Sequence, residues 1–254
     1  MAKKKTPTVA VGSTGHEIDR RAHFLNLLHA TPIAKDEQLS NLGLFLNRQT
    51  LSRVLFMHHL YQQILPVHGV VMEFGVRWGQ NLALVSSFRG IYEPFNYTRK
   101  IIGFDTFAGF PHMHAKDGKA AYLKKGAYGV GKDYEQYLTQ VLDYHEHESP
   151  IAHLRKFELV KGDAVVEVKR YLERNPETVI AFAFFDLDLF EPTLRCLEAI
   201  REHVCKGAVL GFDEIGSHAF PGETLAVKQA LGFQQCRLRR VPWNPNTSYM
   251  VVGE

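Results

Sequence analysis

Short runs of apolar residues recur along the chain, separated by stretches in which apolar positions follow the period of a helix. The runs cover residues 70–74, 100–105, 157–161, 179–186 and 207–213. Because their apolar character is continuous rather than alternating, they indicate strands that are buried on both faces. The stretches between them predict crossover helices at residues 80–89, 133–147, 164–174 and 193–204. The pattern predicts an α/β domain with a mostly parallel sheet and helices on both faces.

Two further elements flank this core. Residues 45–65 carry apolar positions at helical spacing, and Pro66 ends the pattern. Near the C-terminus, residues 232–239 and 247–252 are typical of strands, and the turn-forming residues 242–246 between them predict an antiparallel hairpin. The complete sheet is expected to have seven strands, an ending unlike that of a plain dinucleotide-binding fold.

The outer and inserted segments suggest the domain organisation. Residues 1–44 form an extension before the predicted domain at residues 45–254, and the polar residues 1–20 predict a mobile tail. Residues 112–131 are rich in Gly, Lys and His and interrupt the alternation of strands and helices. Loops of this length in compact domains are commonly lids or binding loops, so we expect a lid there; a disordered insertion is the alternative.

The overall composition is that of a globular protein. Among the 254 residues, 45% are hydrophobic and 22% are charged, and the net charge is +3. Residues 3–5 are all lysine, which is typical of a solvated tail, and no basic stripe with interleaved aromatics supports nucleic-acid binding. The longest apolar run, residues 179–185, is too short to cross a bilayer, and the first residues lack the apolar stretch of a secretory signal. We expect a cytoplasmic protein with no nucleic-acid or membrane partner.

The first predicted strand leads into the sequence EFGVRWGQN at residues 73–81. Gly75 and Gly79 would let the backbone turn sharply and approach a ligand at the start of the next helix, where open α/β sheets bind nucleotides. We count Glu73 and Asn81 with these glycines as candidate cofactor-binding residues. The GxGxxG fingerprint is absent, so a strand–helix turn that binds nothing is the alternative.

Two aspartates follow the second and third predicted strands. Asp105 is placed to accept hydrogen bonds from both hydroxyls of a ribose, as an acidic residue does at this position in nucleoside-binding sheets. Asp163 is placed to contact an adenine amino group. Each has an alternative role in local structure, because Asp105 can cap the turn that follows it and Asp163 can N-cap the next helix.

Acidic residues cluster directly after the fourth and fifth predicted strands. Asp186, Asp188 and Glu191 follow one apolar run, and Asp213 and Glu214 follow the next. Neighbouring parallel strands would bring both clusters to one edge of the sheet, where the negative charge is costly unless a cation neutralises it. Carboxylate oxygens without His or Cys partners favour Mg²⁺, Mn²⁺ or Ca²⁺ over zinc. The alternative is that these acids form turns in two separate loops.

The same region offers candidates for a catalytic base. His218 follows the second acidic cluster and is a candidate base or substrate contact. Asp188 is another candidate, and Asp186 is preferred, because it is the first acid past the strand and the nearest to the expected metal ion. The alternative for His218 is that of a solvated surface residue, as expected for most of the 13 histidines.

Four segments, taken in order, resemble the macrocin O-methyltransferase family, a metal-dependent branch of class I methyltransferases that acts on sugar hydroxyls of antibiotics and related glycosides. The segments are EFGVRWGQN, GFDTFAGFP, FFDLDLFEPT and GFDEIG, and the last two are the most specific. The resemblance covers about residues 50–252. One departure is Glu214, which stands where the family usually has a second aspartate and lengthens that side chain by one methylene.

The resemblance implies a Rossmann-like sheet that binds S-adenosylmethionine. It also implies a magnesium-assisted O-methyltransferase whose acceptor is a hydroxyl of a sugar, a nucleotide sugar or a glycosylated natural product. A homo-oligomer is compatible with such an enzyme. The residues that the resemblance places at the cofactor are Glu73, Gly75, Gly79 and Asp105, and those that it places at the metal ion are Asp186, Asp213 and Glu214.

Other functions stay open at this point. One is a different metal-dependent enzyme on the same sheet, either hydroxylase-like or modifying nucleotide sugars. Another is a non-catalytic nucleoside-binding module that has lost its metal affinity through Glu214. An NAD-dependent oxidoreductase is disfavoured, because the phosphate-binding glycine pattern is missing.

Overall fold

The computed structural model describes residues 13–120 and 123–254, so the lysine run at residues 3–5 lies outside the described residues. The chain divides into two compact units, Met1–Arg53 and Val54–Glu254. The division falls inside helix α2 (Arg48–Ile64), whereas the sequence places it before residue 45. No helix within these described ranges is long and apolar enough to cross a membrane.

The first unit contains helix α1 (Gly15–His29), the 3₁₀ turn η1 (Leu42–Phe45) and the start of α2. Helix α1 begins with a capping box, in which Thr14 Oγ1 accepts a hydrogen bond from Glu17 N and Glu17 Oε2 accepts one from Thr14 N. The helix thus occupies part of the segment for which the sequence predicts a mobile tail. None of the residues of α1 or η1 is buried.

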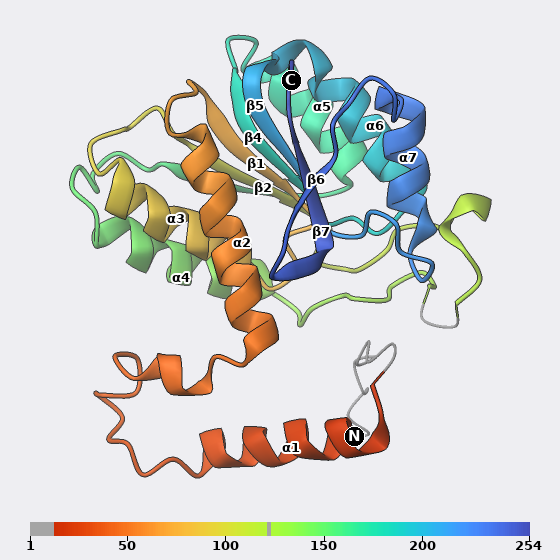
Figure 1. The fold of residues 1–254 in the computed structure, drawn as a ribbon. Coiled ribbons are helices and arrows are strands. Elements are labelled where there is room, and N and C mark those ends of the chain that lie inside the picture. The colour runs from red at the N-terminus through yellow and green to blue at the C-terminus, as the bar shows by residue number, and fades with distance from the viewer. Residues whose placement is uncertain (1–12, 121–122) are drawn as a thin grey trace. The chain divides into compact units, whose positions relative to one another are not determined.

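In the second unit, the described residues form one seven-stranded sheet with the strand order β3-β2-β1-β4-β5-β7-β6 (Figure 1). Strands β1 to β5 are parallel, and β7 is antiparallel to both β5 and β6. This topology confirms the predicted Rossmann-like sheet. The strands are β1 (Val70–Phe74), β2 (Ile101–Asp105), β3 (Phe157–Lys161), β4 (Ile180–Phe185), β5 (Val204–Phe212), β6 (Arg239–Val241) and β7 (Asn244–Val251).

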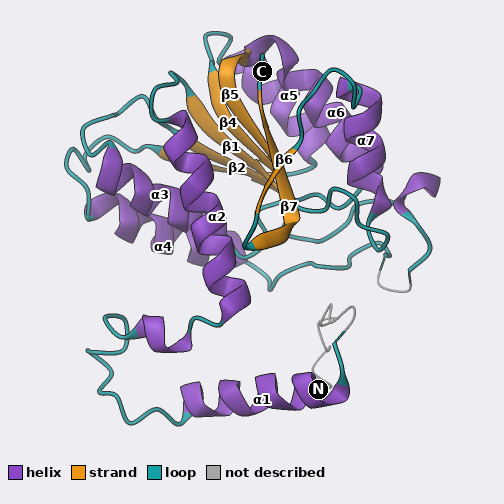
Figure 2. Ribbon diagram, in the orientation of Figure 1, coloured by secondary structure: helices purple, strands orange, loops and turns teal. Residues whose placement is uncertain are grey.

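Helices cover both faces of the sheet, as Figure 2 shows. One face packs against α2, α3 (Gln80–Tyr92) and α4 (Tyr134–His147), whose buried side chains share a core with those of the strands. The other face packs against α5 (Ala164–Arg174), α6 (Phe190–Ile200) and α7 (Pro221–Leu231). Burial on both faces explains why the strands read as continuous apolar runs.

The elements differ from the prediction mainly after residue 190. Helix α6 ends at Ile200, four residues before the predicted end, and β5 begins at Val204, three residues before the predicted start. The strand continues through Gly207, which interrupts the apolar run and so hides the first part of the strand in the sequence. Helix α7 was not predicted. It ends before Gly232, whose φ of +70° stops the helix, and turns follow it where the sequence predicts a strand at residues 232–239.

Candidate active site

A row of phenylalanine rings fixes the ends of four parallel strands. Phe104 in β2 stacks on Phe74 in β1 with ring centroids 5.1 Å apart. Phe74 stacks on Phe185 in β4 at 5.0 Å, and Phe185 on Phe212 in β5 at 5.4 Å. These residues are also direct partners in the strand register. The row therefore brings the residues that follow each phenylalanine to one level at the carboxyl edge of the sheet.

Those following residues are Gly75, Asp105, Asp186 and Asp213. Backbone hydrogen bonds continue the ladder through three of them: Gly75 N to Phe104 O at 3.0 Å, Asp186 N to Phe74 O at 2.8 Å and Asp213 N to Phe185 O at 3.1 Å. The cofactor candidates on β1 and β2 and the acidic candidates on β4 and β5 thus lie along one continuous edge. The sequence prediction that neighbouring strands bring them together agrees with this arrangement.

Gly75 is the point of closest approach between the two halves of this edge. Its φ is +94°, and a β-carbon there would overlap the backbone oxygen of Asp186. Gly79 has a different reason to be glycine, because its φ is +76° and a β-carbon would overlap the side chain of Leu138 in α4. The structure therefore explains both glycines by packing, and a cofactor contact at either stays a prediction.

The side chains of Glu73 and Asn81 point toward each other across the glycine turn that connects β1 to α3. Both are buried, and Asn81 Nδ2 donates a hydrogen bond to Glu73 Oε1 at 2.7 Å. This bond ties the end of β1 to the first turn of α3. The pair holds the shape of the glycine turn, and direct contact of either residue with a cofactor is a prediction that the structure does not test.

Asp105 is held in place by two backbone amides. Its Oδ2 accepts a hydrogen bond from Arg77 N at 2.7 Å, and its Oδ1 accepts one from Phe107 N at 2.6 Å. The bond from Phe107 N shows that Asp105 caps the turn that follows it, which is the alternative role given by the sequence. The bond from Arg77 N also connects Asp105 to the glycine turn after β1. Each carboxylate oxygen can accept more than one hydrogen bond, so these two bonds leave room for ribose hydroxyls, and the contact of Asp105 with a ribose stays a prediction.

Asp163 is the N-cap of helix α5. Its Oδ1 accepts a hydrogen bond from Val165 N at 3.0 Å. The bond from Gly162 N to Asp105 O, at 2.9 Å, places this cap beside the end of β2. The structure thus shows the capping role of Asp163, and its contact with adenine stays a prediction.

The acids after β4 and β5 act on one another electrostatically. Burial raises the pKa of Asp188 well above its ordinary value. The nearby charges of Asp186, Asp213 and Glu214 raise the pKa of Asp188 further. The acids after β4 and those after β5 are thus close enough for their charges to influence Asp188, and their role as one site stays a prediction.

A fifth carboxylate, Glu223 in the first turn of α7, lies behind this cluster. It is completely buried, and its Oε1 accepts a hydrogen bond from Glu214 N at 2.8 Å. Its Oε2 has no hydrogen-bond partner among the residues that the structure describes. Burial is the main reason that the pKa of Glu223 lies well above its ordinary value, and the charge of Asp213 adds to this. Glu223 does not stand out in the sequence, because the pattern of apolar positions gives no sign of α7.

The cluster suits a hard cation in its chemistry but does not form a complete coordination shell. Asp186, Asp213 and Glu214 offer carboxylate oxygens, which Mg²⁺ prefers. Within residues 13–120 and 123–254, however, no group of three or more His, Cys, Asp or Glu side chains is arranged to hold a metal ion. The residues predicted as ligands thus have the right donor atoms, and their binding of a metal ion stays a prediction.

Two other residues complete the description of this edge. His218 lies in the loop between β5 and α7 and is exposed. Arg77 was not singled out from the sequence, yet its guanidinium lies 4.8 Å from the centroid of the Tyr128 ring, and its charge counteracts the raised pKa of Asp188. No local pattern marks Arg77, because its partners come from separate loops.

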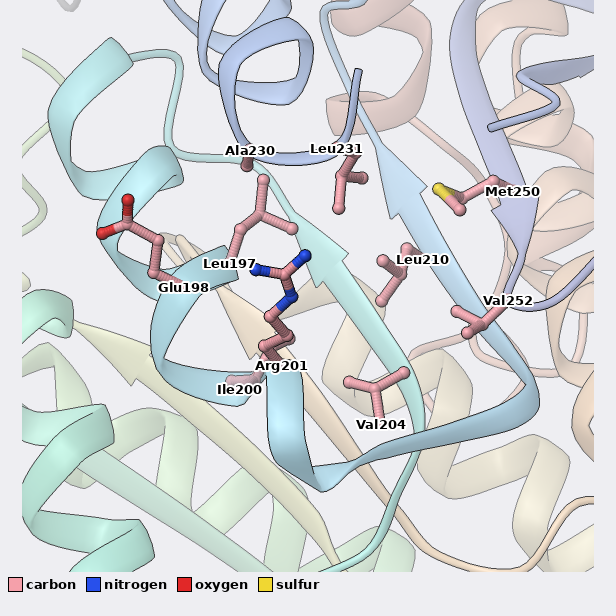
Figure 3. A pocket seen from close by; sticks show the side chains of 10 residues that line it. All are labelled: Leu197, Glu198, Ile200, Arg201, Val204, Leu210, Ala230, Leu231, Met250 and Val252. Atoms are coloured by element: carbon pink, nitrogen blue, oxygen red, sulfur yellow. The ribbon is translucent and has the colours of Figure 1, made fainter. Parts of the chain in front are cut away.

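A hollow of about 180 Å³ lies elsewhere, between α6, α7, β5 and β7 (Figure 3). Its lining includes Val204 at the amino end of β5, together with Leu197, Leu210 and Met250, which point into it. The lining contains none of the predicted site residues. The hollow is largely apolar, and its lining on β5 reaches from Val204 to Leu210 and does not include the acids that follow the strand, so we place the active site at the carboxyl edge.

Two solved structures are similar to this chain over nearly its whole length. One is a crystal structure of CalS11, named as the calicheamicin methyltransferase, whose sequence is 42% identical to this chain. The match covers 96% of this chain and 95% of CalS11, with a TM-score of 0.93. An apo structure of CalS11, named there as TDP-rhamnose 3′-O-methyltransferase, an enzyme in calicheamicin biosynthesis, is 40% identical over 96% and 97% of the two chains, with a TM-score of 0.85.

A more distant structure shares the fold alone. The O-methyltransferase NovP is 17% identical, with a TM-score of 0.57 over 79% of each chain. No protein-family model matches the chain, and none of the curated proteins does. The relationship at 40–42% identity, which extends over nearly the whole of both chains, is sufficient to assign the family.

Proposed function

Because this chain belongs to the macrocin O-methyltransferase-like family of S-adenosylmethionine-dependent class I methyltransferases, we propose that it methylates a hydroxyl of a nucleotide-linked sugar in natural-product biosynthesis. The chain is an O-methyltransferase that uses S-adenosylmethionine, and its acceptor is a small sugar-like molecule. CalS11, at 40% identity, is named for a TDP-linked sugar, which supports a nucleotide sugar as the acceptor class.

One observation carries the proposal. The glycine turn after β1 and the acidic segment after β4 touch at Gly75 and Asp186, so a cofactor bound at the first would present its methyl group toward the second. Methyl transfer needs the acceptor oxygen, the methyl carbon and the sulfur in line, and holding them there supplies much of the rate. When bound, S-adenosylmethionine supplies a methyl group that is already activated on a sulfonium centre.

The residues of the chain divide the remaining work. Asp105 would hold the ribose hydroxyls and so fix the cofactor along the edge. Asp186 would accept the proton of the attacking hydroxyl, and His218 is the second candidate for that role. Asp188 does not suit it as well, since burial and the neighbouring acids raise the pKa of its carboxyl well above the ordinary value and so favour the form that already carries a proton.

Asp186, Asp213 and Glu214 would hold a hard divalent cation if one takes part. Such an ion would chelate two neighbouring acceptor oxygens and lower the pKa of the hydroxyl. The concentration of carboxylates at this edge supports the proposal, because a cation would offset their mutual repulsion. A cytoplasmic location, a homo-oligomeric state and the lack of nucleic-acid and membrane partners stay predictions from the sequence.

The experiment that tests the proposed function is methyl transfer from isotopically labelled S-adenosylmethionine to a panel of nucleotide sugars, free sugars and catechols, followed by mass spectrometry. We expect label on a nucleotide sugar. Label on a catechol alone would contradict the acceptor class. Binding of S-adenosylhomocysteine without transfer to any member of the panel would favour a non-catalytic nucleoside-binding module.

A further inference from the structure

The segment of residues 112–117, within the predicted lid, is docked on the first turn of helix α6. The N-cap residue of α6, Leu189, offers no side-chain hydrogen bond to the helix. Instead Asp117, in the 3₁₀ turn η2 (Ala115–Asp117), accepts a hydrogen bond from Phe190 N through its Oδ1 at 2.6 Å. A residue 73 positions away in the sequence therefore caps this helix.

Both oxygens of Asp117 are used. While Oδ1 accepts from Phe190 N, Oδ2 accepts from His114 N, also at 2.6 Å, and the side chain is almost completely buried. A buried carboxylate is costly unless hydrogen bonds compensate it, and two backbone amides do so here. The carboxylate thus ties the inserted loop to the helix start, and no local need of the loop accounts for both bonds.

Other contacts hold the same joint closed. Lys116 Nζ lies 3.9 Å from the centroid of the Phe190 ring and donates a hydrogen bond to Gln229 Oε1 in α7 at 3.1 Å. His112 Nε2 lies 3.2 Å from Glu191 Oε2 in the first turn of α6. The loop, α6 and α7 therefore meet around the amino end of α6.

Gly222 shows how tightly the joint is packed. A β-carbon there would lie 2.6 Å from Phe190 N, 2.7 Å from Asp117 Oδ1 and 3.0 Å from Asp188 O. The next residue, Glu223, holds the amide of Glu214. The joint is consequently in contact with both acidic segments, the one before α6 and the one after β5.

We propose that Asp117 is a positioning residue for methyl transfer, which holds the acidic segment 186–188 at the carboxyl edge by capping helix α6. The segment connects the end of β4 to this helix, so its two anchors are the strand ladder and the cap. This role rests on the proposed function, because it assumes that the acidic segment faces the acceptor. Asp117 itself touches neither the cofactor nor the acceptor in this account.

The test compares Asp117→Ala, Asp117→Asn and Gly222→Ala with the unmodified enzyme. Asn caps helices about as well as Asp, so its amide oxygen can keep the bond to Phe190 N, while its NH₂ group cannot accept the bond from His114 N. Gly222→Ala keeps the Asp117 side chain and disturbs the cap, because its β-carbon would collide with Phe190 N and Asp117 Oδ1. Asn96→Ala is the matched control, because Asn96 also accepts hydrogen bonds from two backbone amides, Thr98 N and Arg99 N, before the amino end of β2.

Three measurements are made on each protein: hydrogen exchange of the amides of residues 187–191, kcat and KM for a nucleotide-sugar acceptor, and the affinity for S-adenosylhomocysteine. We expect Asp117→Ala to speed exchange in this segment and to lower kcat/KM on the order of 10²-fold, as small misplacements of reacting groups do. Cofactor affinity should stay unchanged. Asp117→Asn should recover most of the turnover, Gly222→Ala should behave like Asp117→Ala, and Asn96→Ala should leave turnover unchanged.

Several outcomes would overturn the proposal. If hydrogen exchange at residues 187–191 is the same in Asp117→Ala as in the unmodified protein, Asp117 does not hold the acidic segment. Faster exchange with unchanged kcat and KM would show that anchoring of the acidic segment by Asp117 does not affect methyl transfer. If Asp117→Ala does not fold, Asp117→Asn and Gly222→Ala decide the question. If the unmodified protein methylates no nucleotide sugar, the proposed function fails, while the exchange measurement still decides the role of Asp117.

Discussion

The α-carbon of Gly75 lies against the backbone oxygen of Asp186, with no space between them for a side chain. The contact joins the turn that follows β1 to the acidic segment that follows β4. It exists because β1 and β4 are neighbours in the sheet and because Phe74 and Phe185 stack in the layer below. Cofactor binding and acceptor activation are thus expected to depend on the same few atoms of backbone.

The first prediction concerns this contact. Gly75→Ala should lower the affinity for S-adenosylhomocysteine and the free energy of unfolding, because the φ of +94° is strained for alanine and the new methyl group displaces Asp186. The strain alone is worth about 1–3 kcal/mol. Calorimetric titration and denaturant unfolding measure the two effects. Gly131→Ala is the control, since a β-carbon at Gly131 meets nothing within 4 Å; equal behaviour of the two variants would contradict the prediction.

The second prediction concerns the ribose. Asp105→Asn should weaken S-adenosylhomocysteine binding about 10- to 100-fold, because a hydrogen bond to a charged group is worth roughly 1.5–3 kcal/mol. Titration calorimetry gives the affinity, and Asp143→Ala, which removes an exposed carboxylate from α4, should leave it unchanged. An Asp105→Asn variant with the affinity of the unmodified protein would show that Asp105 serves the turn alone.

The third prediction concerns the cation. Turnover by the unmodified enzyme should fall when a chelator removes divalent ions and should return with Mg²⁺, whereas Asp213→Ala should be slow in both conditions. The reason is that Asp213 is one of the proposed ligands, and its charge, after burial and the charge of Asp186, raises the pKa of the neighbouring Asp188. Initial rates with and without chelator test this, and full activity of the unmodified enzyme in chelator would remove the metal from the mechanism.

The fourth prediction concerns stability at the far edge of the sheet. Glu146 is buried between Arg89, at 2.9 Å, and Lys156. Burial alone would raise the pKa of Glu146, but hydrogen bonding by Lys156 and the charge of Arg89 outweigh it and hold this pKa below its ordinary value. The ionised Glu146 therefore stabilises the folded protein at pH values above the ordinary glutamate pKa of about 4.3. This stabilisation is lost as the pH falls through the lower pKa that Glu146 has in the folded protein.

Removing that charge by Glu146→Gln should cost about 3–5 kcal/mol of unfolding free energy at neutral pH, because it leaves two buried cations with too little compensation. The variant should also lose less stability than the unmodified protein as the pH is lowered. Denaturant unfolding at a series of pH values measures both. Glu198→Gln removes an exposed partner of Arg195 and should cost about 0–1 kcal/mol; a similar cost for the two variants would contradict the account.

The strand pattern of the sequence is sufficient to predict the sheet and its acidic edge. Asp186 and Asp213 each end an apolar run, and parallel strands leave their ends at one edge whatever the side chains do. The same logic placed Asp105 beside Gly75. These predictions needed only the period of the apolar positions and the rule that ligands bind beyond the carboxyl ends of such strands.

Two helices were missed although their ends carry recognisable signals. Helix α1 opens with Thr14 and Glu17 in a capping box, and α7 opens with Pro221 and stops at Gly232. These signals sit at the helix ends, whereas the prediction relied on apolar spacing inside the helices. In α7 that spacing is weak, because the helix also buries Gly222 and the carboxylate of Glu223.

The hydrogen-bond partners of individual side chains could not be predicted from the sequence. The bond from Phe190 N to Asp117 and the bond from Glu214 N to Glu223 depend on where separate elements meet in space. The sequence likewise offered two roles for Asp163, and only the structure shows its bond to Val165 N. Partners of this kind follow from tertiary packing, which no local spacing encodes.

We expect cofactor and acceptor to meet at the carboxyl edge of the sheet, beside the contact between Gly75 and Asp186. A crystal structure with S-adenosylhomocysteine, a nucleotide sugar and Mg²⁺ is the decisive test of this arrangement. We predict adenosine density beside Asp105, the sulfur on the side of the glycine turn that faces Asp186, and a sugar hydroxyl within about 3–3.5 Å of the position of the transferred methyl group. Cofactor density away from the carboxyl edge, or Asp186 and Asp213 directed into separate regions, would contradict the account.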